Sequence, residues 1–223
     1  MPAAESTTPP TAPQATTKGP DDETRQRLVE ATTRCIAARG SVRMTVADVA
    51  VEAGVARSTV YRYFPTRDDL LLGVLVSRID ASVDRQVAAL GDPDDAVGSI
   101  AELVLGSIEL VGGDPVNEAL FSAEGRWVVT ALEFGAEPVV DAVYRHLRPL
   151  LERWQADGQL HPDLDLRETA RWINAVSNLM LSPPLAQRSA AAKRLFLDHY
   201  LLRALVPAGG AEWPPSRIRS RES

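Results

Sequence analysis

The 223-residue sequence has few of the features that anchor a chain in a membrane or cross-link it. It contains a single cysteine, Cys35, so an internal disulfide is excluded. The longest apolar runs, such as residues 70–76, fall far short of the roughly 18 residues that indicate a membrane-spanning helix. The start of the chain also lacks the charged-then-apolar order of a signal peptide. We therefore expect a cytoplasmic protein that does not associate with membranes.

The sequence also lacks the common signatures of enzymes and metal sites. Its three histidines, His146, His161 and His199, are scattered and do not follow a metal-binding spacing. Neither a glycine-rich phosphate loop nor a nucleophile elbow is present. We therefore expect a protein that is not an enzyme and that needs neither a metal nor a cofactor.

Charge is distributed unevenly along the chain. Residues 23–78 contain nine arginines and six acidic residues, a net charge of +3, although the whole chain carries −6. The remainder therefore carries −9. This asymmetry suggests a basic module joined to an acidic body, in which a local patch could meet phosphate groups while the whole molecule stays soluble.

The apolar residues follow a helical period nearly throughout, and no stretch alternates apolar and polar residues for long enough to predict a strand. The sequence therefore predicts an all-α fold of about nine helices between disordered tails at residues 1–20 and 207–223. We expect Thr45 to cap the second helix and Gly54 to end it, and Pro149 to kink or break the helix in which it lies. The expected helices lie at about 22–38, 45–53, 56–63, 66–90, 93–112, 115–133, 138–157, 166–181 and 186–205.

The segment VARSTVYRYF, residues 55–64, is too short to be a stable helix alone. It follows a capped helix and a glycine turn, so residues 44–63 have the proportions of a helix-turn-helix, whose second helix enters a DNA major groove. Val55, Val60 and Phe64 would anchor this short helix, leaving its polar residues free to face DNA.

The residue types on this helix suit contacts with a duplex. Arginine binds guanine edges or phosphates through a planar fork, hydroxyls near a helix start bind phosphate, and tyrosine contacts thymine methyls, sugars or phosphates. The predicted DNA contacts are Thr45, Arg57, Ser58, Thr59, Tyr61, Arg62, Tyr63 and Arg67, of which Arg57, Ser58, Tyr61 and Arg62 are placed to read sequence. The alternative is an ordinary solvated surface helix.

The segment MTVADVAVEAGVARSTVYRYFPTRDDLL, residues 44–71, resembles the DNA-binding segment of the TetR family of bacterial transcriptional regulators. The resemblance implies an N-terminal helix-turn-helix domain at residues 21–81 and a larger helical domain at 82–206 that binds a small molecule and pairs two subunits. Ala56 stands where the family usually has a serine or another capping residue, and Ser58 replaces a frequent glycine. We therefore expect the recognition helix to begin without a side-chain cap.

The body contains aromatic and amide residues that suit a largely apolar, drug-sized ligand with one or two polar groups. For any one of them, the alternative is that it simply fills the core or an interface. The candidate ligand-binding residues are Phe121, Trp127, Phe134, Tyr144, Trp172, Asn174 and Asn178.

The family resemblance further implies that the last helices pair two subunits as a four-helix bundle. The candidate interface residues are Leu147, Leu151, Trp154, Ile173, Val176 and Met180. We expect a homodimeric repressor that binds palindromic double-stranded DNA and is released by a small-molecule effector. The alternatives are an activator or ligand-independent regulator with the same DNA module, and a small-molecule sequestering protein that does not bind DNA.

Overall fold

The computed structural model describes residues 20–90, 93–109, 113–125 and 137–207. The described residues form nine α-helices and contain no β-strand, which confirms the predicted all-α fold. None of the helices in these ranges is long and apolar enough to cross a membrane. Apart from Pro20 and Pro207 at their inner edges, the two expected tails lie outside the described residues.

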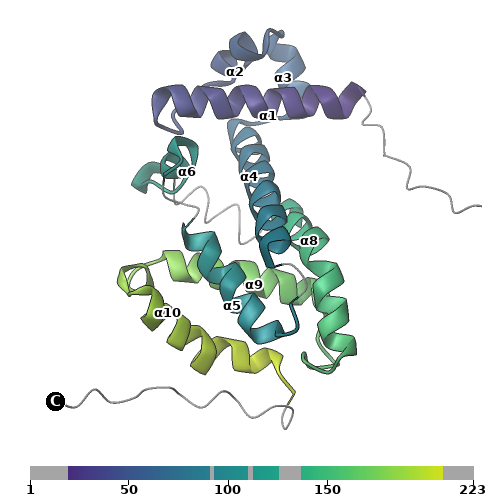
Figure 1. Ribbon diagram of the computed structural model, residues 1–223. Helices are drawn as coiled ribbons and strands as arrows, with labels where there is room; N and C mark the ends of the chain where they lie inside the picture. The colour runs from purple at the N-terminus through teal and green to yellow at the C-terminus, as the bar shows by residue number, and fades with distance from the viewer. Residues whose placement is uncertain (1–19, 91–92, 110–112, 126–136, 208–223) are drawn as a thin grey trace, which may run out of the picture.

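The upper part of the molecule is a module of three helices, α1 (Pro20–Arg39), α2 (Val46–Ala53) and α3 (Arg57–Tyr63), packed on the start of α4 (Arg67–Leu90). In Figure 1, α2 and α3 lie above α1, and α4 descends from beneath α1 into the rest of the molecule. The centre of this module is a set of fully buried side chains: Leu28, Ile36, Val49, Val60, Phe64, Leu70 and Val74.

The ends of α2 are formed as the sequence predicts. The hydroxyl of Thr45 accepts a hydrogen bond from the backbone N–H of Asp48, and the Asp48 carboxylate accepts one from the backbone N–H of Thr45 at 2.8 Å. Gly54 ends the helix with a φ of 66°, a left-handed conformation that favours glycine. Together the two ends fix the turn that orients α3.

The lower part of the molecule is a body of helices packed around the distal half of α4. It comprises α5 (Ala96–Glu109), α6 (Pro115–Leu120), α8 (Glu137–Ala156), α9 (Leu166–Leu181) and α10 (Ala190–Phe196). Helix α8 lies beside the lower half of α4 (Figure 1), and its Trp154 is completely buried in a second core. Helix α8 continues through Pro149, so the predicted break is absent.

Two predicted helices are shorter than expected. The helix expected at 115–133 is interrupted after Leu120, where the hydroxyl of Ser122 donates to the carbonyl of Ala119 and accepts from the N–H of Gly125; residues 123–125 are helical again. A side chain at Gly125 would collide with the carbonyl of Leu120. The remainder of that prediction, from residue 126, lies outside the described residues.

The predicted helix at 186–205 is divided into three parts. Ser189 caps α10, which ends at Phe196; a π-helical turn (Leu197–Leu201) and a 3₁₀ turn (Leu202–Leu205) follow. Leu197 and Leu202 are both fully buried although they are five residues apart. The wider π turn accommodates this spacing, which a regular α-helix does not place on one face.

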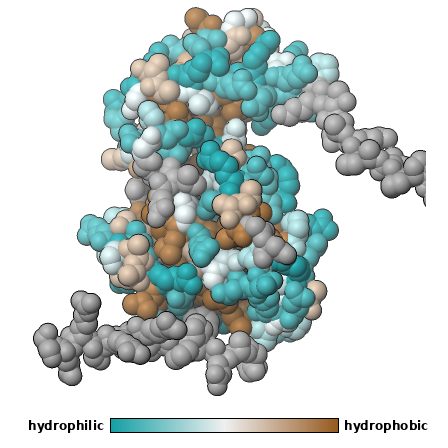
Figure 2. All heavy atoms as spheres, viewed as in Figure 1, coloured by the Kyte–Doolittle hydropathy of each residue, from teal (hydrophilic) through white to brown (hydrophobic). Residues whose placement is uncertain are grey.

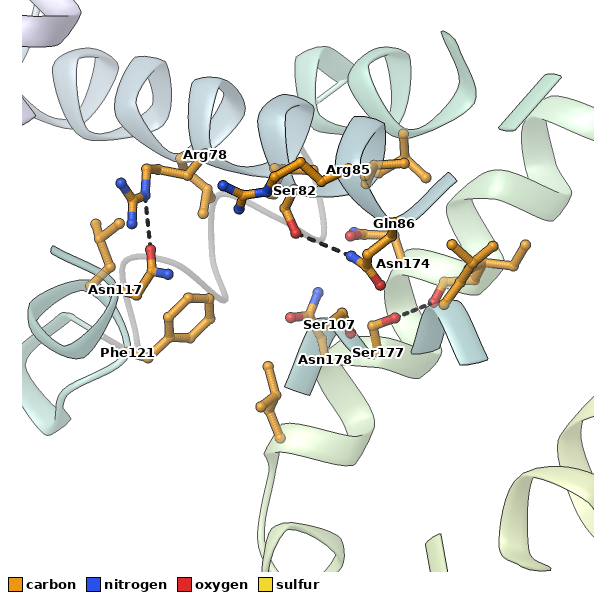
Figure 3. Close-up of a pocket in the computed structure, with 18 of the residues that line it drawn as sticks. Arg78, Ser82, Arg85, Gln86, Ser107, Asn117, Phe121, Asn174, Ser177 and Asn178 are labelled. Atoms are coloured by element: carbon orange, nitrogen blue, oxygen red, sulfur yellow. Dashed lines mark hydrogen bonds between the residues drawn. The ribbon is translucent and has the colours of Figure 1, made fainter. Parts of the chain in front are cut away.

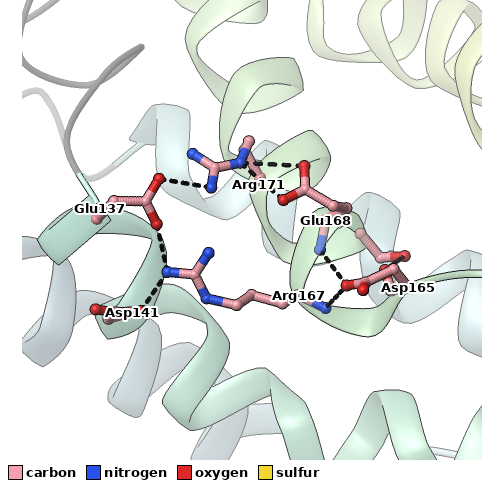
Figure 4. Close-up of polar contacts among 7 residues, drawn as sticks. Glu137, Asp141, Asp165, Arg167, Glu168 and Arg171 are labelled. Carbon is pink, nitrogen blue, oxygen red and sulfur yellow. Dashed lines mark hydrogen bonds and ion pairs between the residues drawn. The ribbon is translucent and has the colours of Figure 1, made fainter.

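A cluster of ion pairs joins the N-terminal ends of α8 and α9 (Figure 4). Arg171 Nη2 lies 2.8 Å from Glu137 Oε1, and Arg167 binds both Glu137 and Asp141. These hydrogen bonds hold the pKa of Glu137 below its usual range. Because the carboxylates are exposed and the arginines are only partly buried, we attribute to the cluster a role in aligning the two helices rather than a large stabilisation.

Candidate nucleic-acid interface and ligand cavity

Helix α3 has one face in the core and the other in solvent. Val60 and Phe64 are fully buried, and Val55 is partly buried against the same core. Arg57, Ser58, Tyr61 and Arg62 are exposed, with 45% of Tyr61 accessible to solvent. Figure 2 shows that the visible surface of this upper module is largely hydrophilic. The arrangement therefore presents the four predicted sequence-reading side chains on a helix that the core holds in place.

The start of α3 also has the predicted form. Ala56 occupies the N-cap position and provides no side-chain hydrogen bond. The free backbone N–H groups at the start of the helix are therefore not occupied by a capping side chain. Such groups are favourable partners for phosphate oxygens.

Four other predicted contact residues already make contacts within the module or are partly covered. The Tyr63 hydroxyl donates to Asp21 Oδ1 at 2.7 Å, and Arg67 Nη2 donates to the carbonyl of Val42 at 2.6 Å. Thr45 caps α2, and Thr59 is partly buried. Their assignment to DNA stays a prediction, and the structure adds a positioning role for Tyr63 and Arg67.

The sequence analysis missed Arg25, which supports α3 from α1. Its guanidinium lies 4.4 Å from the centre of the Phe64 ring and donates to the carbonyl of Tyr63 at 3.1 Å. The sequence around Arg25 gave no local signal for this role, because both partners are 38 or more residues away. Arg25 therefore fixes the C-terminal end of the recognition helix.

A second contact network fixes the start of α2. Arg39 Nη1 donates to Asp48 Oδ2 at 2.7 Å, joining α1 to α2. The hydrogen bond from Arg39 is the largest cause that holds the pKa of Asp48 well below its usual range, and the hydrogen bonds from Thr45 add to it. Asp48 is therefore charged at neutral pH and serves both helix capping and helix packing.

A cavity opens in the body beneath this module. It is bounded by α4, α5, α6, α8 and α9 and encloses about 910 Å³, including the part open to solvent. Its walls are mainly apolar side chains, with polar groups contributed chiefly by α4 and α9 (Figure 3). The labelled polar residues around it are Arg78, Ser82, Arg85, Gln86, Ser107, Asn117, Asn174, Ser177 and Asn178.

The predicted ligand-binding residues are distributed unequally around this cavity. Phe121, Asn174 and Asn178 line it. Tyr144 and Trp172 are not among its lining residues and instead pack partly buried against the second core. Trp127 and Phe134 lie outside the described residues. The sequence analysis missed the contribution of α4, whose residues 78, 82, 85 and 86 recur at helical spacing and share a face with apolar positions.

Arg78 connects the cavity wall to α6. Its Nε donates to Asn117 Oδ1 at 3.0 Å, and its Nη2 lies 2.5 Å from Asp114 Oδ2. Asp114 also caps α6, and the Arg78 hydrogen bond lowers the pKa of its carboxyl. Helix α6 in turn packs under α1, where Val116 and Leu120 join the core of the upper module. The cavity wall and the upper module therefore share packed residues.

The six predicted interface residues are buried within one chain. Leu147, Leu151, Trp154, Ile173, Val176 and Met180 are exposed by 4% or less and belong to the second core. The family resemblance suggested these residues as an interface, but they lie on the faces that α8 and α9 turn toward each other within the chain. Exposed apolar side chains occur instead at Leu179, Leu195 and Tyr200, on α9 and around α10.

The described residues offer little for other chemistry. No group of three or more histidine, cysteine or acidic side chains in the described ranges is arranged to hold a metal ion. Burial raises the pKa of the Cys35 thiol, which favours its unreactive protonated form. The side chain packs partly buried against the core of the upper module.

Comparison with known proteins agrees with this geometry. Residues 28–74 match the family model described as bacterial regulatory proteins, tetR family. The chain is 31% identical over 186 residues to the HTH-type transcriptional repressor KstR of Mycolicibacterium smegmatis, covering 81% of this chain and 87% of that protein. The chain belongs to the TetR family. Membership of a family of regulators also agrees with the expectation that the protein is not an enzyme.

Two further comparisons define the extent of the similarity. An uncharacterised HTH-type transcriptional regulator of Mycobacterium bovis, Mb2274c, is 32% identical over 108 residues, but the match spans 48% of this chain and 56% of that protein. The structure of the transcriptional repressor QsdR of R. erythropolis superposes with a TM-score of 0.63 at 20% identity, covering 86% of this chain and 100% of that one. At 20% identity, the similarity to QsdR supports the fold alone.

Proposed function

We propose that this TetR-family protein is a cytoplasmic homodimeric repressor that binds a palindromic DNA operator and leaves it when a small molecule occupies the cavity. The observation that carries the proposal is the exposed face of α3, with Arg57, Ser58, Tyr61 and Arg62 projecting from a helix anchored by Val60 and Phe64. A short helix with two arginine forks and several hydroxyls suits a major groove.

The contacts divide into two groups by their expected role. Arg57, Ser58, Tyr61 and Arg62 read base edges, and Thr45, Thr59, Tyr63 and Arg67 hold the DNA backbone. Arg67 already donates a hydrogen bond to the carbonyl of Val42, so fewer of its N–H groups are free to bind DNA than those of Arg57. Only the first group should determine sequence preference.

The dimer in this proposal forms through the last two helices. Leu179, Leu195 and Tyr200 give this region an exposed apolar surface, and Tyr200 is 73% accessible in the single chain. A two-fold axis there would present two copies of α3 to successive major grooves about 34 to 36 Å apart. Tyr200→Asp should weaken the dimer, which sedimentation over a concentration series would measure.

Ligand release is proposed to act through α4 and α6. Helix α4 begins in the upper module and lines the cavity, while α6 contacts both. A ligand that repositions these helices changes the separation of the two α3 helices and lowers DNA affinity. Thermodynamic linkage then requires operator DNA to weaken ligand binding by the same factor.

The decisive experiment is the selection of bound fragments from a random duplex library, followed by affinity measurements at several salt concentrations. We expect a mirrored consensus and a binding constant that falls steeply with salt, since phosphate contacts release counterions. A folded protein without salt-dependent affinity for any duplex would overturn the proposal. An asymmetric consensus would overturn the palindrome and leave DNA binding in place.

A further inference from the structure

The cavity is electrostatically one-sided. Its charged lining residues are Arg78 and Arg85, both on α4, and no carboxylate lines it among the described residues. Arg78 is neutralised by Asp114. Arg85 makes no hydrogen bond or ion pair within the described part of the chain, so one positive charge at the cavity has no counter-charge there.

Arg85 lies where a ligand head group could reach it. Arg85 is exposed to solvent, whereas apolar side chains that line the cavity, such as Leu147 and Ile173, are buried. In Figure 3 the guanidinium of Arg85 lies near Ser82, on the cavity side of α4. The cavity therefore combines a cationic mouth with an apolar interior.

The oxygen of a neighbouring amide lacks a hydrogen-bond partner within the described residues. Gln86 Nε2 donates to Ser82 Oγ at 3.1 Å, but Gln86 Oε1 is buried without a hydrogen bond within the described residues. A buried oxygen of this kind is costly unless a ligand or water donates to it. An ionised carboxylate cannot donate to this oxygen, so Gln86 Oε1 requires a separate donor and the case for a carboxylate ligand rests on Arg85 alone.

We propose that the effector is an apolar molecule that carries a single carboxylate, with Arg85 binding the carboxylate at the mouth of the cavity. This inference rests on the proposed ligand-binding function. A guanidinium matches a carboxylate through two parallel hydrogen bonds, and this geometry favours a carboxylate over a neutral hydroxyl. A cationic ligand is disfavoured because it would meet Arg85 without a carboxylate to offset the repulsion.

The test uses three probes with the same apolar chain: octanoate, 1-octanol and octylamine. Calorimetric titration of the full-length protein at neutral pH should give octanoate an affinity at least about tenfold higher than that of octanol, with octylamine the weakest. Arg85→Gln should reduce octanoate affinity to about that of octanol. Arg148→Gln provides the matched control, since Arg148 pairs with Glu152 on the exposed side of α8 and does not line the cavity.

The outcomes separate this inference from the proposed function. Equal binding of octanoate and octanol, or an octanoate preference that survives in Arg85→Gln, overturns the carboxylate inference and leaves a ligand cavity in place. If none of the three probes binds while the same sample binds duplex DNA, both the carboxylate inference and the ligand-release step fail, and DNA binding stands. Circular dichroism of Arg85→Gln establishes that any loss is not caused by unfolding.

Discussion

The recognition helix and the cavity are built in different ways. Helix α3 carries its exposed functional face and its buried anchor within residues 57–64, on consecutive turns of one segment. The cavity is assembled from five helices that span residues 75–181. A surface built from one segment can be deduced from local sequence, whereas a cavity depends on how distant segments pack.

The largest expected effect distinguishes the two faces of the recognition helix. Phe64→Ala should lower the free energy of unfolding by about 3 to 5 kcal/mol, because it leaves a large cavity in the core of the upper module. Urea denaturation monitored by circular dichroism measures this loss of stability. Tyr61→Ala, on the exposed face, is the control and should change stability by less than about 0.5 kcal/mol. Similar losses from both variants would contradict the division of α3 into core and groove faces.

The second prediction concerns which arginine reads sequence. Arg57→Ala should cost about 1 to 3 kcal/mol of binding to the selected consensus and relax preference at the bases it contacts. Arg67→Ala should weaken binding to all duplexes alike and reduce the salt slope by about one. Fluorescence anisotropy against consensus and scrambled duplexes distinguishes the two, with Arg148→Ala as a control arginine remote from α3. A uniform loss from Arg57→Ala would remove its role as a reader.

The features that could be predicted from sequence are those with local causes. The Thr45 cap and the Gly54 turn follow from residues within a few positions of the backbone groups they affect. The same holds for Val60 and Phe64, whose spacing identifies the buried face of α3.

The features that could not be predicted depend on tertiary packing. The family resemblance suggested residues such as Trp154 and Met180 for a subunit interface, but α8, α9 and their neighbours bury them within the chain. Arg25 and Arg78 act through partners 36 to 39 residues away. Tyr144 and Trp172 have the right chemistry for a ligand site, but their helices direct them elsewhere.

The third prediction tests whether the two regions communicate. Arg78→Met removes the contacts of α4 with Asp114 and Asn117 while retaining apolar bulk. It should reduce the coupling between cavity ligand and operator by about 0.5 to 2 kcal/mol. Octanoate titrations with and without the consensus duplex measure this coupling. The control is Arg145→Met, which removes an ion pair between Arg145 on α8 and Asp80 on α4 and leaves the Arg78 contacts in place. Unchanged coupling in Arg78→Met would exclude this connection as the route.

A smaller effect is expected at the start of α2. Thr45→Ala removes the side-chain cap and should lower the free energy of unfolding by about 1 kcal/mol. Thr45→Ser keeps a hydroxyl at the same position and should retain most of the stability. Equal destabilisation by serine and alanine in urea denaturation would show that the methyl group of Thr45, rather than its cap, matters.

The smallest effect is a pH dependence of stability at Asp48 in the upper module. The described cavity lining contains no acidic side chain of this kind. Because Arg39 and Thr45 lower the pKa of Asp48 in the folded state, its charged form stabilises the fold above the unfolded pKa of roughly 4. That contribution is lost as pH falls below this value toward the folded pKa. Asp48→Asn should therefore be less stable than the parent at pH 7, and the difference should shrink as pH is lowered below about 4. Urea midpoints across a pH series measure it, and a difference that stays constant down to about pH 3 would show that the Arg39 and Thr45 contacts do not depend on the charge of Asp48.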